Sequence, residues 1–382
     1  MQYRNVFREI GISAEDIEAR LREIVYTFFY DEEESLYHPV GDDMAYIEDT
    51  GNHDVRTEGM SYGMMICVQL DKREEFNRLW KWAKTYMYMT EGENEGYFAW
   101  SCRTDGEKNA YGPAPDGEEF FAMALFFASH RWGDREGIYA YEREAREILR
   151  ACLHKGEQGR PGKAIWNREN GQILFVPGSP FTDPSYHLPH FYELFSLWAY
   201  EEDRIFWKKA ARASREYLAL ACHPVTGMSP EYGEFDGSPM RKIMSCGERY
   251  DRFYSDAYRT AANIGLDYMW FDTDYGQYCA PLRLMRFLRT DLEAARCVFE
   301  VDGTPVEKNV LHPLGLLAAT AQGALTVERE EPRKAGSDWD VAARWVEWFW
   351  QQPLRRGERR YYDNCLYLFA FLALCGHYRI WE

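Results

Sequence analysis

Hydrophobic and polar positions form two kinds of segment that alternate along the chain. In the first kind, apolar residues recur at helical spacing with charged residues between them, as with Ile17, Leu21 and Ile24. This spacing predicts an amphipathic helix that buries one face. In the second kind, nearly every position is apolar, as from Met64 to Leu70. A helix that is apolar all round must be covered by protein on every side.

Each kind of segment occurs about six times. The amphipathic segments lie near residues 14–28, 71–87, 141–152, 203–220, 282–288 and 338–350. The apolar segments lie near residues 58–70, 118–132, 183–198, 255–270, 311–325 and 361–374. The strand signal is weak and confined to connecting segments such as residues 173–176. The pattern therefore predicts an all-α protein built from helix pairs, each with one apolar and one amphipathic member.

The arrangement of these pairs follows from what each helix must bury. Six fully apolar helices surrounded by six one-sided helices form a closed double ring, the (α/α)6 barrel. The alternative is an open array of helix pairs, but its concave face would expose inner helices that are too apolar for exposure. No low-complexity linker divides the chain, so we expect one domain over residues 1–382.

Charge and composition narrow the classes of ligand. The net charge of −17 disfavours nucleic acid and anionic membranes as partners and is compatible with a neutral sugar. No run approaches the roughly 18 apolar residues of a membrane span, and the first residues lack the apolar core of a secretory signal. The nine cysteines are scattered without a C-x-x-C pair, which favours reduced thiols and a cytoplasmic location. No obligate protein partner is evident from the sequence.

A polar side chain stands at the start of every apolar segment; these side chains are Glu58, Asp116, Tyr186, Asp256, His312 and Asp363. In a barrel whose helices alternate in direction, all six inner helices begin at the same end, so these groups gather around one opening. A single acid in a first helical turn is common, because it caps the helix and complements its dipole. Six polar groups around one opening favour a binding or catalytic site instead.

Aromatic residues near this opening favour a carbohydrate ligand. Tyr97 and Trp100 lie in the loop before the second apolar segment, and their flat faces suit the apolar C–H faces of sugar rings. Paired carboxylic acids suit glycosidic cleavage, in which one protonates the leaving oxygen and the other activates water or attacks. No glycine-rich phosphate loop or Walker motif indicates a nucleotide.

Five motifs lie in order along nearly the whole chain. They are Arg56-Thr57-Glu58-Gly59-Met60-Ser61-Tyr62-Gly63, Ala114-x-Asp116-Gly117, Asp183-Pro184-Ser185-Tyr186-His187-Leu188-Pro189, Ser255-Asp256-Ala257-Tyr258-Arg259 and Leu311-His312-Pro313. Together they resemble glycoside hydrolase family 8. The third and fifth motifs are most similar to the exo-oligoxylanases of that family, which release xylose from the reducing end of their substrates.

The resemblance implies an (α/α)6 barrel, inversion at the anomeric carbon, no metal or other cofactor, and a β-1,4-xylo-oligosaccharide as the substrate. By position in the motifs, Glu58 would be the general acid and Asp256 the general base. A general acid must stay protonated near neutral pH, whereas a helix N-terminus favours the ionised form. Burial of Glu58 and the negative charge of Asp116 would have to raise the pKa of Glu58 by more than the helix N-terminus lowers it.

The same resemblance implies the substrate contacts. Asp116 would hold the sugar on the non-reducing side of the cleaved bond, and His312 would contact the sugar on the reducing side. Tyr186 and Arg259 would orient the attacking water and the general base.

Three alternatives remain open. An endo-acting β-1,4-xylanase or glucanase of the same family would share the carboxylates but would need a groove open on both sides of the cleaved bond. A sugar epimerase or isomerase on the same barrel would use histidines, for which His187, His190 and His312 are candidates. A non-catalytic sugar-binding protein would need no acid–base pair. His187 and His190 also form an H-x-x-H pair, but the absence of a third ligand favours packing over a metal site.

Overall fold

The computed structural model describes residues 3–244, 247–273, 276–289 and 297–382. Cys246, one of the nine cysteines considered above, lies outside these ranges. The inner helices are α3 (Thr57–Gln69), α5 (Pro115–Trp132), α7 (Pro189–Trp198), α9 (Arg259–Phe271), α11 (Pro313–Gln322) and α13 (Arg360–Leu374). The outer helices are α2 (Ala14–Phe29), α4 (Arg73–Trp82), α6 (Tyr141–His154), α8 (Arg204–Ala221), α10 (Cys279–Leu288) and α12 (Asp338–Trp350), and a short helix α1 (Val6–Glu9) precedes them.

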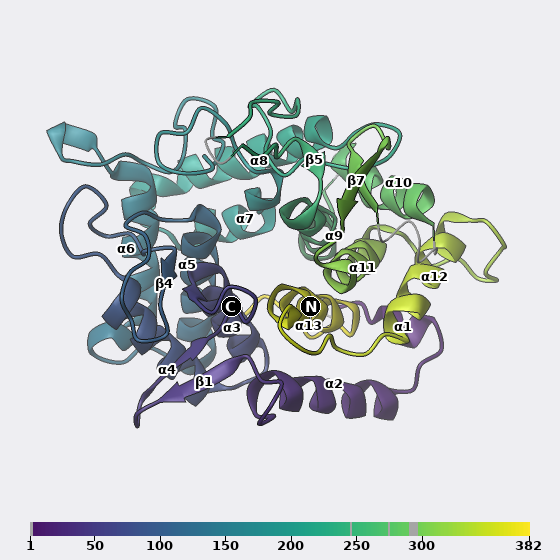
Figure 1. The fold of residues 1–382 in the computed structure, drawn as a ribbon, viewed down its shortest axis with the longest axis horizontal. Coiled ribbons are helices and arrows are strands. Elements are labelled where there is room, and N and C mark those ends of the chain that lie inside the picture. The colour runs from purple at the N-terminus through teal and green to yellow at the C-terminus, as the bar shows by residue number, and fades with distance from the viewer. Residues whose placement is uncertain (1–2, 245–246, 274–275, 290–296) are drawn as a thin grey trace.

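The six inner helices form a closed ring (Figure 1). Each of them contacts the next one along the chain, and α13 contacts α3, which closes the ring. Each inner helix also packs against an outer helix, from α3 on α4 to α13 on α2. This arrangement is the (α/α)6 barrel, so the predicted fold is confirmed and the open array is wrong.

Burial follows the sequence pattern that predicted the barrel. In α13 every residue from Tyr361 to Leu374 is buried, whereas α6 buries only one face, which includes Tyr141, Ala145 and Ile148. The largest cluster of buried side chains draws on elements from Val6 to Tyr378. In the part of the chain that the structure describes, no helix is long and apolar enough to cross a membrane.

Several helix starts differ from the predicted ones, and proline is the usual reason. The second apolar helix was expected from residue 118, but α5 begins at Pro115, because proline fits a first turn that needs no N–H donor. Asp116 therefore lies within the first turn. The third apolar segment is divided into a 3₁₀ turn (Pro184–Tyr186) and α7, which again begins at a proline. The fourth is divided into a 3₁₀ turn (Ser255–Tyr258) and α9.

The described strands form three small antiparallel sheets in the loops. They pair β1 (Tyr37–Val40) with β2 (Met44–Ile47), β3 (Val55–Arg56) with β4 (Ser101–Cys102), and β5 (Arg252–Phe253) with β6 (Cys297–Glu300), which also pairs with β7 (Pro305–Asn309). The expected strand at residues 173–176 is reduced to an isolated bridge between Trp166 and Ile173. Strands this short carry too little periodicity to be recognised in a sequence.

Candidate active site

Arg259 lies at the centre of a group of carboxylates at the N-terminal ends of the inner helices. Its Nη1 atom lies 2.8 Å from Asp116 Oδ2 and 3.2 Å from Glu58 Oε2. Its Nη2 atom lies 3.5 Å from Asp256 Oδ1 and 3.9 Å from Asp183 Oδ2. Four carboxylates from four segments of the chain thus share one buried guanidinium.

Glu58 is fixed by two donors from helices far along the chain. Tyr361 donates its hydroxyl hydrogen to Glu58 Oε1 at 2.8 Å, and Arg259 donates to Oε2 at 3.2 Å. Gly59 allows this approach, since a Cβ atom at that position would lie 2.7 Å from the Tyr361 ring. The Glu-Gly pair at the start of α3 therefore lets the sixth inner helix reach the carboxylate.

Burial raises the pKa of Glu58 to about 7. The positive charge of Arg259 opposes this rise, and the negative charges of Asp116 and Asp256 add to it. The pKa of Glu58 is thus raised despite the positive charges of Arg259 and Arg56. A carboxyl group with a pKa near the working pH is well suited to donate a proton to a leaving group.

Asp116 and Asp183 are the deeply buried members of the group. Asp116 Oδ1 accepts a hydrogen bond from the Gly117 backbone at 2.9 Å, and Asp183 Oδ1 accepts one from Ser185 at 2.7 Å. Asp183 Oδ2 has no hydrogen-bond partner in the described part of the chain. Burial raises the pKa of both carboxyl groups despite the nearby Arg259. Sequence reasoning quoted Asp183 in a motif without assigning it to the site.

Asp256 is the most accessible of the four, with a side chain 33% exposed compared with 17% for Glu58. It follows Ser255, whose φ of 36° lies in a region that non-glycine residues rarely occupy. Such strain costs about 1–3 kcal/mol and often marks a functional site. Tyr362 stabilises the turn by donating its hydroxyl hydrogen to the Ser255 carbonyl at 3.3 Å. The turn presents Asp256 where water can reach it.

Tyr186 forms one wall of the carboxylate group. Its ring is almost fully buried, lies 5.6 Å from the Arg259 guanidinium and stacks on Phe175 at 6.0 Å. Burial raises the pKa of the Tyr186 hydroxyl well above its usual value, so the hydroxyl keeps its proton at neutral pH. The structure therefore brings Tyr186 and Arg259 together, as the sequence predicted.

His312 lies immediately before α11 and is supported by the start of α13. Its Nδ1 atom lies 3.3 Å from Asp363 Oδ2, and its ring packs 4.8 Å from the Tyr362 ring. Asp363 is fixed in turn, because its Oδ2 pairs with Arg355 and its Oδ1 accepts a hydrogen bond from the Gly315 backbone in the first turn of α11. The imidazole is thus held in one orientation at the opening.

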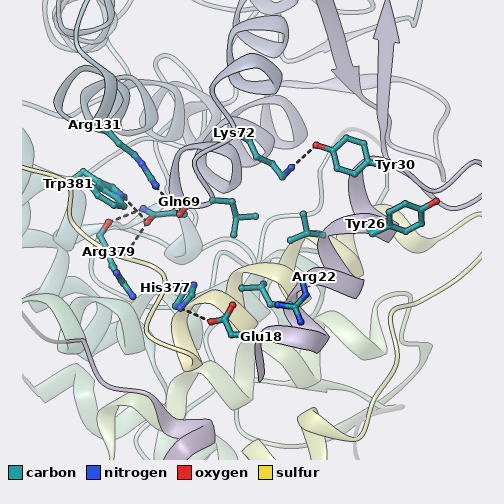
Figure 2. A pocket seen from close by; sticks show the side chains of 13 residues that line it. Glu18, Arg22, Tyr26, Tyr30, Gln69, Lys72, Arg131, His377, Arg379 and Trp381 are labelled. Atoms are coloured by element: carbon teal, nitrogen blue, oxygen red, sulfur yellow. Dashed lines mark hydrogen bonds and ion pairs between the residues drawn. The ribbon is translucent and has the colours of Figure 1, made fainter. Parts of the chain in front are cut away.

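A pocket of about 90 Å³ lies among several of these groups. Its lining includes Glu58, Asp256, His312, Tyr361 and Tyr362, together with Arg56 and Arg359, whereas the predicted residues Asp116, Tyr186 and Arg259 do not line it. A larger cavity of about 510 Å³ lies elsewhere and contains none of the predicted site residues. Figure 2 shows the residues around it, which include Gln69, Lys72, Arg131, Arg379 and Trp381. Because Gln69 and Arg131 lie at the C-terminal ends of α3 and α5, this cavity is at the opposite end of the barrel.

The two predicted aromatic residues have different outcomes. Trp100 is 37% exposed, its carbonyl accepts a hydrogen bond from Thr57 at 3.0 Å, and its ring lies 5.3 Å from the Arg56 guanidinium, beside the pocket. The expectation that Tyr97 faces the opening is wrong. Its ring is completely buried, and its hydroxyl lies 3.1 Å and 3.0 Å from the carbonyls of Ala151 and Lys163. Tyr97 is a core residue and is not available to a ligand.

The histidines of the H-x-x-H pair also belong to the core. His187 has no exposed surface, and its two ring nitrogens lie within hydrogen-bond distance of Thr182 and Ser214. His190 packs against the Trp270 ring at 5.4 Å. Because neither ring reaches the opening, only His312 remains of the three histidines that the epimerase alternative proposed.

Sequence reasoning missed the two tyrosines that complete the site. Tyr361 and Tyr362 were noted only as the start of the last apolar helix, yet one bonds to Glu58 and the other supports the Asp256 turn. The rule that identified Glu58, a polar group at the start of an inner helix, applies equally to them.

Comparison with known proteins gives a consistent result. The model of the family described as glycosyl hydrolases family 8 matches residues 42–330. The chain is 52% identical, over its full length and 95% of the relative, to the reducing end xylose-releasing exo-oligoxylanase of Halalkalibacterium halodurans. It is 48% identical, over 98% of its length and 96% of the relative, to the protein of the same name from Bifidobacterium adolescentis.

A solved structure agrees with the fold. The structure of Rex8A from Paenibacillus barcinonensis complexed with xylose is 52% identical in sequence and superposes with a TM-score of 0.94, covering all of this chain and 98% of that one. The closed barrel, the carboxylates at one end and these matches along the whole chain show that the protein belongs to the glycosyl hydrolases of family 8.

Proposed function

We propose that the protein hydrolyses β-1,4-xylo-oligosaccharides with inversion and releases xylose from the reducing end. One observation carries the chemistry: a carboxyl group with a pKa of about 7, Glu58, and an accessible carboxylate, Asp256, lie on opposite nitrogens of the same guanidinium. The substrate is supported by the names of the relatives that match the whole chain.

Glu58 donates its proton to the glycosidic oxygen as the bond to the anomeric carbon breaks. Asp256 accepts a proton from the water that attacks that carbon from the opposite face, so one water is consumed and the configuration inverts. Both carboxyl groups contact Arg259. Inverting pairs typically lie roughly 6.5–9.5 Å apart, which leaves room for this water. Tyr186 and Arg259 orient the water and the base, and Asp116 holds the sugar on the non-reducing side.

In this proposal, the loop at Leu311 and His312 closes the opening on the reducing side. The imidazole is fixed by Asp363 and Tyr362, and the Leu311 carbonyl accepts a hydrogen bond from Arg355 at 2.5 Å. A rigid histidine can both bind a hydroxyl of the terminal sugar and block further sugars. This closure favours an exo-acting enzyme over an endo-acting one. Trp100 supplies an aromatic face at the rim.

The remaining proposals concern the chain as a whole. The continuous core from Val6 to Tyr378 supports one catalytic domain over residues 1–382. The thiols of Cys67, Cys152 and Cys365 are buried and free, which supports the expectation of a reducing, cytoplasmic compartment.

Xylotriose labelled with ¹³C at the anomeric carbon of its reducing end tests this proposal. NMR should show the label in free xylose, and the new reducing end of xylobiose should appear first as the α-anomer. A label that stays in xylobiose would contradict cleavage at the reducing end, and an initial β-anomer would contradict inversion.

The loop is tested separately. His312→Ala should weaken cleavage of short oligomers, and deletion of the loop should admit polymeric xylan. If His312→Ala still releases only xylose from the reducing end at unchanged efficiency, the loop does not select the substrate.

A further inference from the structure

Glu119 is a buried acid for which the proposed reaction has no use. It lies on α5 three residues after Asp116, so the two side chains project from the same face of the helix. Asp116 contacts Arg259, whereas Glu119 contacts the hydroxyl of Tyr192 on α7. Neither Glu119 nor Tyr192 has any exposed surface.

The Tyr192 hydroxyl lies within hydrogen-bond distance of two oxygen atoms of other residues. One is Glu119 Oε1, and the other is the backbone carbonyl of Tyr186 at 3.0 Å. A tyrosine hydroxyl carries one hydrogen, and a carbonyl can only accept. If Tyr192 donates to Tyr186, the hydrogen between Tyr192 and Glu119 must therefore come from Glu119.

The surroundings of Glu119 favour the protonated carboxyl group. Its second oxygen, Oε2, has no hydrogen-bond partner among the described residues. An ionised carboxylate left in this way would be strongly disfavoured in the core. Burial raises the pKa of Glu119 well above its usual value; the hydrogen bond to Tyr192 opposes this rise, and the charge of Asp116 adds to it.

We propose that Glu119 is a positioning residue that acts as a neutral carboxylic acid, donating a hydrogen bond to Tyr192, which in turn donates to the Tyr186 carbonyl. One turn of α5 then fixes both sides of the site, Asp116 against Arg259 and, through Tyr192, the turn that carries Tyr186. The consequence for catalysis rests on the role proposed above for Tyr186 in orienting the attacking water.

Kinetics on xylotriose test the positioning role. Glu119→Leu and Tyr192→Phe should each lower kcat about tenfold or more with little change in KM, because misplaced groups slow the chemical step while Asp116 still holds the sugar. The double variant should be no slower than the worse single variant, since both belong to one hydrogen-bonded unit. Glu119→Gln should stay within about threefold of the wild type, because its amide N–H can donate as the neutral acid does.

Tyr141→Phe is the matched control. It removes the hydroxyl of another tyrosine without exposed surface, which bonds to Asn77 between the outer helices α4 and α6. This variant should lose stability as Tyr192→Phe does but keep its kcat. Equal loss of kcat in the two tyrosine variants, or a Glu119→Gln variant as slow as Glu119→Leu, would overturn the positioning role.

Infrared spectroscopy tests the protonation state without reference to activity. The difference spectrum between the wild type and Glu119→Gln at neutral pH should contain the carbonyl band of a protonated carboxylic acid. A difference spectrum with only carboxylate bands would overturn the proposal even if the kinetics agreed. Conversely, a protein that carries the acid band but does not hydrolyse xylotriose would refute the proposed function and leave the hydrogen-bonded unit intact.

Discussion

Ionisable side chains at the two ends of the barrel are held there for different reasons. At the C-terminal ends of the inner helices, Arg131 donates to the carbonyls of Val68 and Gln69 at 2.6 and 3.0 Å, where α3 ends. Arg379 donates in the same way to the Gly376 carbonyl at 2.8 Å, just after α13. These arginines lie around the cavity of Figure 2. Cations placed there satisfy the last carbonyls of a helix and complement its dipole.

Glu58, at the N-terminal end of α3, does not serve its helix in this way. No side chain caps α3, α5 or α9, and Glu58 bonds to Tyr361 and Arg259 instead. The acids are crowded and largely buried, and the pKa of Glu58 is raised to about 7. The arginines at the C-terminal ends therefore stabilise the barrel. The acids at the N-terminal ends, by contrast, are buried at a cost to its stability. Ionisable groups with such shifted pKa values are a mark of functional sites.

The largest expected effect is on the reaction itself. Glu58→Gln should lower the turnover of xylotriose by about 10²–10⁴-fold, the usual contribution of a positioned general acid. Glu18→Gln is the control from the opposite end, where Glu18 pairs with His377 in the Figure 2 cavity. It should leave turnover unchanged. Near wild-type turnover by Glu58→Gln would contradict the claim that the N-terminal end, and not the opposite end, carries the catalytic acid.

The next effect is on stability. Arg259→Met should lower the free energy of unfolding by about 3–5 kcal/mol at neutral pH, because it leaves several buried carboxylates without their cation. The loss should shrink as the pH falls, since the carboxyl groups can then take up protons. Urea unfolding at several pH values measures it. A loss that is independent of pH would show that these carboxylates are not what Arg259 stabilises.

Removal of the acid should stabilise the protein above neutral pH. The folded-state pKa of Glu58 is raised from 4.5 to about 7, so its favourable contribution is complete below pH 4.5 and is lost as the pH rises through 7. The variant Glu58→Gln does not titrate at this position. Its stability relative to the wild type should therefore increase between these pH values, by up to about 3 kcal/mol. A difference that stays constant with pH would contradict the raised pKa.

The smallest effect should come from the opposite end. Arg131→Met removes hydrogen bonds to the end of α3 and should lower the free energy of unfolding by about 1 kcal/mol, with kcat unchanged. Paired urea unfolding and xylotriose assays measure both quantities. A marked loss of activity would mean that the Figure 2 cavity is coupled to the reaction.

The sequence was sufficient to predict the barrel because burial leaves a direct pattern in it. Helices such as α13 are buried all round, and α6 on one face only, so the two rings could be told apart before the structure. The alternation of direction then placed the starts of all inner helices at one end, which is why Glu58 and Asp256 were recognised as neighbours. These predictions needed only periodicity and chain direction.

Contacts across the ring could not be predicted in this way. Glu58 meets Tyr361, which lies 303 residues later, and no local pattern states which tyrosine of the last helix faces inward. Tyr97 and Trp100 lie three residues apart in an irregular loop, where no period fixes the direction of a side chain. One is buried in the core and the other lies at the rim. The pKa of Glu58 depends on such contacts, so the direction of its shift could not be predicted from the sequence alone.

The N-terminal end of the barrel raises the pKa of the Glu58 carboxyl group to about 7, so that much of it stays protonated near neutral pH. The most direct test is an NMR titration of the side-chain carboxyl carbons in protein labelled with ¹³C-glutamate, with the Glu58 signal assigned by its absence from Glu58→Gln. A midpoint at about pH 7 is predicted. A midpoint near 4.5, the ordinary value for glutamate, would contradict the account.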